Sequence, residues 1–392
     1  MKLLIYSHFF APSVGGVETI VLSLARGLAE RRTTCGNAEF EVTVATQTPV
    51  GDFQDDALPF TVVRQPSLRQ LWRLVRECDV LHAAGPALPP LVLAWLARKP
   101  AVIEHHGYQA ICPNGLLVHQ PDATVCPGHF QAGNYGECLR CLSCETSAWQ
   151  SFAMLLLQFP RRWLARGASL NIAVSDHVLK REGLPRSAVI YHGIDELRPS
   201  EFAVTERASA QSKICFAYVG RLVSEKGVAT LLRAANKLKK DGFAFDLRII
   251  GDGPQRPQLA AFIHEHQLEN CVRITGYLAG RALEDCLQDV QVIIAPSICE
   301  ETAGLAAMEQ MMRGRAVIAS DIGGLSEIVG DAGVKFTPGD FEALAENMKR
   351  VFQTPSVVES LGAAAKSRAL KLFRRDRMIT EHATAYVAAL RP

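Results

Sequence analysis

At 392 residues, with 48% hydrophobic and 21% charged residues, the chain has the composition of an ordinary soluble globular protein, which excludes a disordered or fibrous one. Its length predicts two domains, because single domains usually span roughly 100–200 residues. A formal net charge of +2 provides no field that would indicate a nucleic acid as partner.

The first half of the chain predicts alternating strands and helices. Its opening stretch, MKLLIYSHFF, predicts a buried strand rather than a signal peptide, because Ser7 and His8 interrupt the apolar run. Apolar residues between positions 17 and 28 follow at helical spacing. Later strands are expected at EVTVATQ, TVVRQ, DVLHAAG, AVIEHH and NIAVS. A strand–helix–strand order predicts a parallel sheet.

Residues 107–146 interrupt this rhythm and carry a cluster of cysteines. Cys138, Cys141 and Cys144 form C-x2-C-x2-C, a spacing at which thiolates share a tetrahedral Zn²⁺. Cys126 is the fourth ligand that we assign, and Cys112, His119 and His129 are alternatives for that place. An iron–sulfur cluster, disulfides or free thiols are the competing interpretations. A segment of this length within a compact domain indicates an insertion with a function.

The stretch WQSFAMLLLQFPRRWLARG, residues 149–167, is apolar with three arginines near its end. One interpretation is a helix that rests on a membrane surface and presents the cleft to a lipid-linked acceptor. The other is a packed helix that ends near Pro160 and has a solvated basic rim. The longest other apolar stretch, Leu88–Ala97, is about half the ~20 residues that a spanning helix needs, so no transmembrane helix is expected. Scattered cysteines are typical of a reducing compartment, so we expect a cytoplasmic protein, with a peripheral position on the inner face of the membrane as the alternative.

The second half repeats the pattern with strands expected at ICFAYVGR, FDLRIIGDG, VRITG, VIIAPS, AVIASD and VKFTP. Together the halves predict an α/β protein with two Rossmann-like, doubly wound parallel-sheet domains that bind ligand in the cleft between them. The expected domains are 1–196 and 197–374, with a helix at 375–392 packing back toward the first. Residues 194–212 lose strand character and predict the linker.

Charged residues and glycines follow the expected strands of the second half. In GRLVSEKG, Arg221 and Lys226 come after a strand and suit a diphosphate. In EETAGLAAMEQM, Gly304 and Leu305 begin a helix whose first N–H groups suit a phosphate. Glu309 on that helix suits a vicinal diol such as a ribose, and Glu301 before it suits a sugar or a cation. The alternative is that these four charged side chains are solvated surface residues without a ligand.

These segments together resemble the nucleotide-binding half of the retaining GT-B glycosyltransferases of family 4 (glycosyltransferase group 1). The resemblance rests on GRLVSEKG, IIGDGP, the two glutamates eight positions apart, and AVIASDIGGLSEIV. In the first half, FFAPSVGGVET resembles the family's glycine-rich loop, HGYQAICP its HDYWFICP-like segment, and YHGID its NGID. A subset of that family carries a similar cysteine-rich insertion.

The resemblance implies a role for each matching residue. The catalytic residues would be His106 near the transferred sugar, Arg221 and Lys226 on the diphosphate, and Glu301 on the donor sugar. The full donor-binding set would be Gly15, Gly16, Gly220, Arg221, Lys226, Glu301, Gly304, Leu305 and Glu309. His106 has the alternative of a buried strand-end histidine, and His105 is the more structural of the two.

The implied reaction is transfer of a sugar from a nucleotide diphosphate sugar to an acceptor hydroxyl of a polysaccharide, glycolipid or metabolite, with the anomeric configuration retained. No cofactor is required for this chemistry, since Arg221 and Lys226 replace a catalytic metal. The alternatives are a non-catalytic nucleotide-sugar-binding protein and a nucleotide-sugar 2-epimerase. Ala303, Gln310, Gly107 and His192 depart from the family pattern, which leaves the donor sugar and base open.

Overall fold

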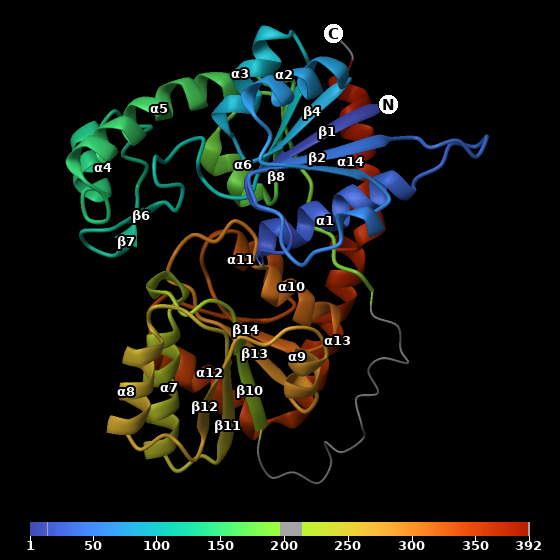
Figure 1. Ribbon diagram of the computed structural model, residues 1–392. Helices are drawn as coiled ribbons and strands as arrows, with labels where there is room; N and C mark the ends of the chain where they lie inside the picture. Colours follow the sequence, from blue (N-terminus) through green and yellow to red (C-terminus); the bar gives the residue numbers. More distant parts are fainter. Residues whose placement is uncertain (14, 197–213, 391–392) are drawn as a thin grey trace. The chain divides into compact units, whose positions relative to one another are not determined.

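The computed structural model describes residues 1–13, 15–196 and 214–390. The chain divides into two compact units, each coloured by sequence in Figure 1. Unit 1 comprises Met1–Asp122, Cys126–Gly193 and Arg374–Pro392; unit 2 comprises Ala123–Val125 and Ile194–Phe373. The predicted linker at 194–212 lies largely outside the described residues.

Unit 1 contains a seven-stranded parallel sheet in the order β3-β2-β1-β4-β5-β8-β9. Its strands are β1 (Lys2–Ser7), β2 (Glu41–Thr46), β3 (Thr61–Arg64), β4 (Val80–Ala84), β5 (Ala101–His105), β8 (Leu170–Ala173) and β9 (Ser187–Val189). A separate two-stranded sheet joins β6 (Val118–His119) and β7 (Thr124–Val125). The first strand is buried on both faces from Leu3 onward, as expected of a parallel sheet with helices on both sides.

The helices of unit 1 include several that pack on this sheet (Figure 1). They are α1 (Gly16–Glu30), η1 (Asp55–Ala57), α2 (Leu68–Glu77), α3 (Leu88–Leu96), α4 (Tyr135–Leu142), α5 (Ala148–Gly167), α6 (Asp176–Glu182) and α14 (Arg375–Ala389). The C-terminal helix α14 packs on α1 and β5, and Arg375 Nε donates to Ser23 Oγ at 2.9 Å. The last helix of the chain is therefore part of unit 1.

Helix α5 continues through Pro160 instead of ending there. Proline removes one backbone N–H and crowds the carbonyl one turn earlier, which here belongs to Leu156. Leu156 is exposed, so water can solvate that carbonyl. A capping box at Ser147 and Gln150 fixes the start of the helix.

Unit 2 contains a six-stranded parallel sheet in the order β12-β11-β10-β13-β14-β15. The strands are β10 (Ile214–Val219), β11 (Phe245–Ile250), β12 (Val272–Gly276), β13 (Val292–Ala295), β14 (Ala316–Ser320) and β15 (Val334–Phe336). Successive residues of β10 alternate between two cores: Phe216 and Tyr218 belong to one, and Cys215 and Ala217 to the other. A sheet buried on both faces requires this alternation.

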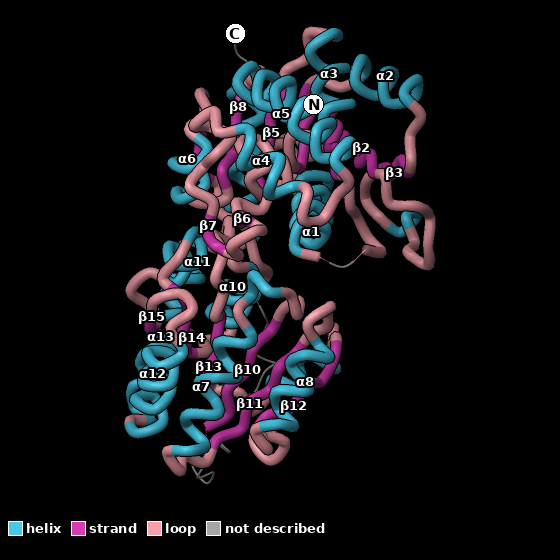
Figure 2. Tube along the Cα trace, turned by 90° about the vertical axis from the view of Figure 1, so that its left-hand side faces the viewer, coloured by secondary structure: helices cyan, strands magenta, loops and turns pink. Residues whose placement is uncertain are grey.

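The helices of unit 2 enclose its strands, as the secondary-structure colouring of Figure 2 shows. They are η4 (Ser224–Lys226), α7 (Val228–Lys240), α8 (Arg256–Glu265), α9 (Gly280–Leu287), α10 (Leu305–Met312), α11 (Gly323–Val329), α12 (Phe341–Gln353) and α13 (Pro355–Leu372). Helices α7, α8 and α12 share the core that contains Phe216, whereas α9 packs on the opposite face. The prediction of two doubly wound α/β domains is confirmed.

Strand order reverses at one place in each sheet: between β1 and β4 in unit 1, and between β10 and β13 in unit 2. In open parallel sheets, ligands bind beyond the carboxyl ends of the strands at this switch point. The loops after β10 and β13 carry the predicted Arg221, Lys226, Glu301 and Gly304. The topology of unit 2 therefore gathers these residues.

Candidate active site

The loop after β10 places Arg221 and Lys226 against a second glycine-containing loop. Its first residue, Gly220, has a φ of 159°. A Cβ at Gly251 would lie 1.8 Å from the carbonyl oxygen of Gly220, so the two backbones approach as closely as glycine allows. The Tyr218 hydroxyl donates to the carbonyl oxygen of Arg221 at 2.7 Å. The sequence IIGDGP thus supports the loop that carries the cations.

Lys226 and Glu301 form an ion pair between the loops after β10 and β13. Lys226 Nζ lies 2.8 Å from Glu301 Oε2, and the Ser297 hydroxyl donates to the other carboxylate oxygen. Burial opposes ionisation of Glu301, but the Lys226 charge and these hydrogen bonds outweigh it and hold the pKa of Glu301 below its usual range. Glu301 is therefore a carboxylate beside an ammonium group.

Arg221 is held less firmly than Lys226. Its side chain is 70% exposed and lies 4.0 Å from Glu225, whereas the Lys226 side chain is 24% exposed. A guanidinium in this position remains available to an anionic ligand.

Two glycines that the sequence analysis gave no role fix the geometry of these loops. Gly227 follows Lys226 with a φ of 66°, and a Cβ there would lie 2.0 Å from the carbonyl oxygen of Pro296. Gly323 has a φ of 60°, and its Cβ would lie 2.8 Å from the backbone of Glu300 and Glu301. The paired glycines in AVIASDIGGLSEIV were the available signal for the second contact.

Helix α10 begins in the loop that carries Glu301. Its N-cap, Gly304, has a φ of 110°, and no side chain caps the helix. The first N–H groups, starting at Leu305, have no acceptor within the helix and suit an anion. Glu309 lies one turn further along and is half-buried. Burial raises the pKa of Glu309, Glu284 adds to the shift and Arg313 opposes it.

In unit 1, Gly15 and Gly16 lie at the start of α1, where Gly15 is the N-cap and has an extended backbone with a φ of −174°. The neighbouring residue 14 lies outside the described residues. The Gly15 carbonyl accepts from the Thr19 hydroxyl at 2.9 Å. These two glycines belong to unit 1 and the residues around Lys226 to unit 2.

His106, directly after β5, belongs to a buried cluster around Glu104. The Glu104 side chain is 0% exposed, and four histidines surround its carboxylate. The distances are 3.3 Å to His82 Nε2, 3.4 Å to His106 Nε2, 3.5 Å to His382 Nε2 and 3.8 Å to His192 Nδ1. His106 also stacks on His192, with ring centroids 5.2 Å apart.

The electrostatics of this cluster favour one buried negative charge. Burial alone would raise the pKa of Glu104, but the charges and hydrogen bonds of His106 and His382 hold it well below its usual range. Burial, together with the charge of His106, lowers the pKa of His192 to about 3, so this imidazole is neutral near pH 7. Glu104 thereby fixes the orientation of His106, and sequence reasoning missed it.

His105 points to the other side of the strand and has structural partners. Its Nε2 lies 2.9 Å from Asn171 Oδ1, and its Nδ1 lies 2.9 Å from Glu182 Oε2. Burial lowers the pKa of His105, but the Glu182 carboxylate outweighs this and leaves the pKa raised. These contacts join β5, β8 and α6.

The predicted metal ligands separate into two groups. Cys126, Cys138 and Cys141 line one small cavity, together with Cys112. Cys144 is exposed, and its Sγ donates to the carbonyl oxygen of Arg140 at 3.5 Å. The structure therefore brings three of the four predicted thiols together and adds the alternative ligand Cys112.

Two doubly wound units, one with cations and a carboxylate at its switch point, define a GT-B type of protein. Two family profiles match the chain: "Glycosyltransferase Family 4" over residues 14–198 and "Glycosyl transferases group 1" over residues 213–354. Glycogen synthase from Mycobacterium tuberculosis is 31% identical over 315 residues, which is 80% of this chain and 69% of that protein. The chain belongs to family 4 (group 1) of the glycosyltransferases.

Other relatives agree with this assignment. The 2-deoxystreptamine glucosyltransferase of Streptomyces kanamyceticus is 32% identical over 174 residues, 44% of this chain and 43% of that protein. HepE from Anabaena, solved in complex with UDP and glucose, has a TM-score of 0.73 at 19% identity, covering 98% of this chain and 99% of that chain. Sucrose-phosphate synthase from Thermosynechococcus elongatus has a TM-score of 0.69 at 19% identity, with 98% of each chain covered. These structures share the fold.

Proposed function

We propose that the protein is a retaining glycosyltransferase that moves a sugar from a nucleoside diphosphate sugar to an acceptor hydroxyl. The observation that carries this proposal is the pairing of Lys226 with Glu301 at 2.8 Å at the switch point of unit 2, beside the start of α10. A nucleotide-sugar donor carries a diphosphate and a sugar. The positive charge and the first N–H groups of the helix suit the diphosphate, and the fixed carboxylate suits the sugar hydroxyls.

Each predicted donor residue has a role in this proposal. Arg221 and Lys226 bind the diphosphate, and the N–H groups at Gly304 and Leu305 bind its oxygens. Glu309 accepts hydrogen bonds from the ribose hydroxyls. Hydrogen bonds from a bound ligand favour the charged form of this carboxylate, which burial alone disfavours. Gly220 in unit 2, and Gly15 and Gly16 in unit 1, leave room for phosphate.

Retention follows from a front-face substitution in this proposal. The acceptor oxygen attacks the anomeric carbon on the face from which the diphosphate departs, and the bond from that carbon to the phosphate oxygen breaks. The acceptor proton passes to the departing oxygen. Arg221 and Lys226 stabilise the negative charge that develops there, so the step needs no divalent metal. His106, oriented by Glu104, contacts the transferred sugar, and Glu301 binds its hydroxyls.

The test is a transfer and hydrolysis assay on purified protein with UDP-, GDP-, ADP- and dTDP-sugars. UDP-sugars are the first choice, because the neighbour HepE was solved with UDP-glucose. We expect slow release of nucleotide diphosphate without acceptor, and a product whose anomeric configuration, read by NMR, equals that of the donor. An inverted product contradicts the retaining mechanism.

The same assay separates the two alternatives. A nucleotide-sugar sensor would bind a donor without releasing nucleotide. A 2-epimerase would convert the donor sugar without transferring it.

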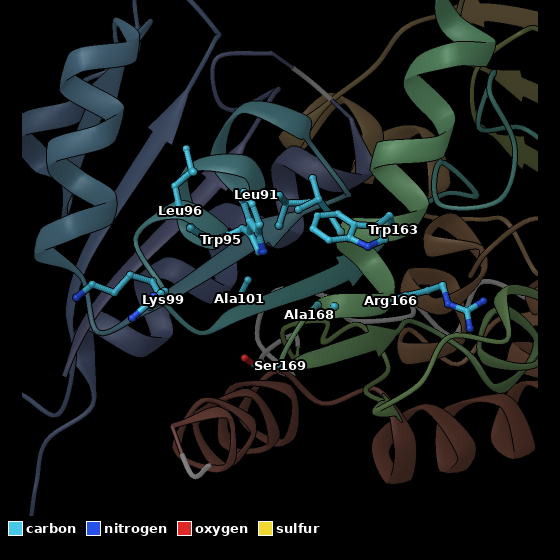
Figure 3. Close-up of a pocket in the computed structure, with 13 residues that line it drawn as sticks. Leu91, Trp95, Leu96, Lys99, Ala101, Trp163, Arg166, Ala168 and Ser169 are labelled. Carbon is cyan, nitrogen blue, oxygen red and sulfur yellow. The ribbon is translucent and has the colours of Figure 1, made fainter.

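We further propose that the acceptor is lipid-linked and that α3 and α5 lie on an anionic membrane surface. Helix α5 exposes Trp149, Phe152, Leu156 and Trp163, and α3 exposes Trp95 and Leu96. Trp95 and Trp163 meet edge to face, with centroids 5.5 Å apart, beside a cavity of about 780 Å³ (Figure 3). Neither helix contains an acidic residue. Exposed aromatics beside basic residues are typical of an interfacial helix.

The charge of this surface favours anionic lipid. Arg98 and Arg166 are exposed, and Figure 3 shows Lys99 and Arg166 extending to opposite sides of the cavity. Arg161, by contrast, donates to Gln158 Oε1 at 2.9 Å and lies partly buried. No helix among the described residues has the length and hydrophobicity to cross a bilayer.

Vesicle cosedimentation tests the surface. We expect binding to vesicles that contain phosphatidylglycerol, weaker binding at high salt, and loss of binding in the double variant Trp95→Ser, Trp163→Ser. Tyr277→Ser, which removes an equally exposed aromatic from unit 2, is the matched control. Equal binding of both variants contradicts the proposal.

A further inference from the structure

Four buried or half-buried thiols converge within residues 107–146. Cys112, Cys126, Cys138 and Cys141 line a cavity of about 20 Å³. A water-sized sphere occupies roughly 10–15 Å³ by this measure, so the cavity holds one body of the size of an ion. The four thiols come from separate parts of the segment, and the chain must fold back on itself to bring them together.

The backbone fixes each of these cysteines. Cys112 N donates to the Tyr108 carbonyl at 2.8 Å, and Cys126 N donates to the Leu117 carbonyl at 2.7 Å. Cys138 and Cys141 lie three residues apart on α4, a spacing that places both side chains on one side of a helix. The thiols are therefore positioned by turns and a helix, as metal ligands are.

Two hydrogen-bond donors point at one of the sulfurs. Gln120 N lies 3.4 Å from Cys141 Sγ, and Asn114 Nδ2 lies 3.7 Å from the same atom. These two contacts help to fix the Cys141 sulfur at the wall of the cavity.

A buried histidine beside the thiols points to the same cavity. His119 lines the cavity, and its two ring nitrogens face carboxylates: Nδ1 lies 2.8 Å from Asp122 Oδ2, and Nε2 lies 3.4 Å from Glu137 Oε2. His119, His129 and Glu137 offer ligand atoms within 4.8 Å of one another, a set that does not include the thiols. Glu137, however, is half-exposed and paired with Arg140 at 3.6 Å, whereas the thiols of Cys112, Cys126 and Cys138 are buried.

We propose that the segment binds one zinc ion through Cys112, Cys126, Cys138 and Cys141, with His119 beside the site but outside the coordination shell. Four thiolates complete the tetrahedral coordination that zinc prefers and close the site, as in structural zinc centres. In this assignment Cys112 replaces Cys144 as the fourth zinc ligand. Because the segment begins one residue after His106, the ion fixes the loop that leaves the candidate active site.

Metal analysis of variants tests this assignment. The full-length protein, purified without added metal, is expected to contain one equivalent of zinc by elemental analysis. Cys112→Ser, Cys126→Ser, Cys138→Ser and Cys141→Ser should each lower that content severalfold and lower the melting temperature. Cys144→Ser and His119→Gln should keep one equivalent. The Cys144 variant is the matched control, because it changes an exposed thiol of the same segment.

Four outcomes overturn the proposal. A metal content that survives Cys112→Ser but not Cys144→Ser returns the fourth place to Cys144. Loss of zinc in His119→Gln alone indicates a mixed histidine site. Iron with visible absorption indicates a cluster, and disulfides found by mass spectrometry exclude the tetrathiolate site. Should a serine variant be insoluble, displacement of zinc from wild type by a thiol-reactive mercurial, followed with a zinc indicator, gives the number of cysteines that hold the ion.

Discussion

Arg221 and Lys226 differ in how the protein holds them, and this difference predicts different effects of removing each. Arg221→Ala changes an exposed side chain, so we expect an unchanged melting temperature and a kcat lowered about 10²–10³-fold, the cost of removing one donor to a developing charge. Lys226→Ala should lower kcat similarly and also destabilise the protein, because it leaves the Glu301 carboxylate without its partner at 2.8 Å.

Steady-state kinetics and thermal unfolding of both variants check this prediction. Lys240→Ala, an exposed lysine at the end of α7, is the control and should leave both quantities unchanged. Wild-type rates in both site variants would show that the diphosphate binds elsewhere.

His192 predicts a pH dependence of stability. Its folded pKa is about 3 because it is buried beside His106, whereas an unfolded histidine titrates near 6.5. Between these values the unfolded chain binds a proton that the folded chain does not, so stability rises with pH by at most about 1.4 kcal/mol per pH unit. His105, with its raised pKa, acts oppositely: its contribution is complete below the unfolded pKa and is lost as pH rises through the folded pKa.

The variant His192→Asn removes only the first of these effects. We expect its urea midpoint to change less with pH than that of wild type between about pH 4 and 6.5, while the two proteins respond alike at higher pH. Parallel curves across the whole range would mean that His192 is protonated in the folded protein.

At the scale of elements, the glycine between η4 and α7 sets where Lys226 lies. In Gly227→Ala, alanine has to adopt a left-handed backbone at a φ of 66°, which is strained for a residue with a side chain. Its Cβ would also lie 2.0 Å from the Pro296 carbonyl oxygen, so the loop has to move. Gly242→Ala, at a φ of 80° with open space around it, carries the strain alone and is the matched control. We expect nucleotide affinity, measured by calorimetry, to fall in the first variant and not in the second. Equal affinities would show that Lys226 tolerates the shift.

Regular elements were predictable from sequence because their signals are local. Apolar runs bounded by turns give the long strands, and glycines after β10 and β13 mark the loops that we propose to bind the donor. The edge strand β9, only three residues long, was not predicted, although the equally short edge strand β15 was predicted at VKFTP. The Glu104 cluster was not predictable, because His82, His192 and His382 reach it from elements far apart in sequence.

The placement of Cys144 shows how a local spacing misleads when the element ends. Successive residues of a helix are rotated by about 100° around its axis. Two residues three positions apart, such as Cys138 and Cys141, therefore lie close together on one face. Two residues six positions apart, such as Cys138 and Cys144, would point about 120° away from each other around the axis. Helix α4 also ends at Leu142, before Cys144. The C-x2-C-x2-C pattern therefore identifies a pair of thiols, and the other two come from turns at Cys112 and Cys126.

At the scale of the whole molecule, the thiol cavity and the candidate donor site around Lys226 belong to different units. The thiol cavity and His106 lie in unit 1, whereas Arg221, Lys226 and Glu309 lie in unit 2. Since these sites share no side chains, their energetic effects should be nearly independent. Loss of zinc from Cys138→Ser is thus expected to lower transfer to the acceptor through the loop after His106, while nucleotide diphosphate affinity stays within about twofold of wild type.

Calorimetric titration with nucleotide diphosphate, alongside a transfer assay on the same samples, measures both quantities. Cys144→Ser controls for the loss of a thiol as such, because that side chain is exposed and lies outside the cavity. A fall in nucleotide affinity that matches the fall in transfer would mean that the metal segment acts on donor binding. Unchanged transfer in zinc-free protein would mean that the ion stabilises unit 1 without contributing to the reaction.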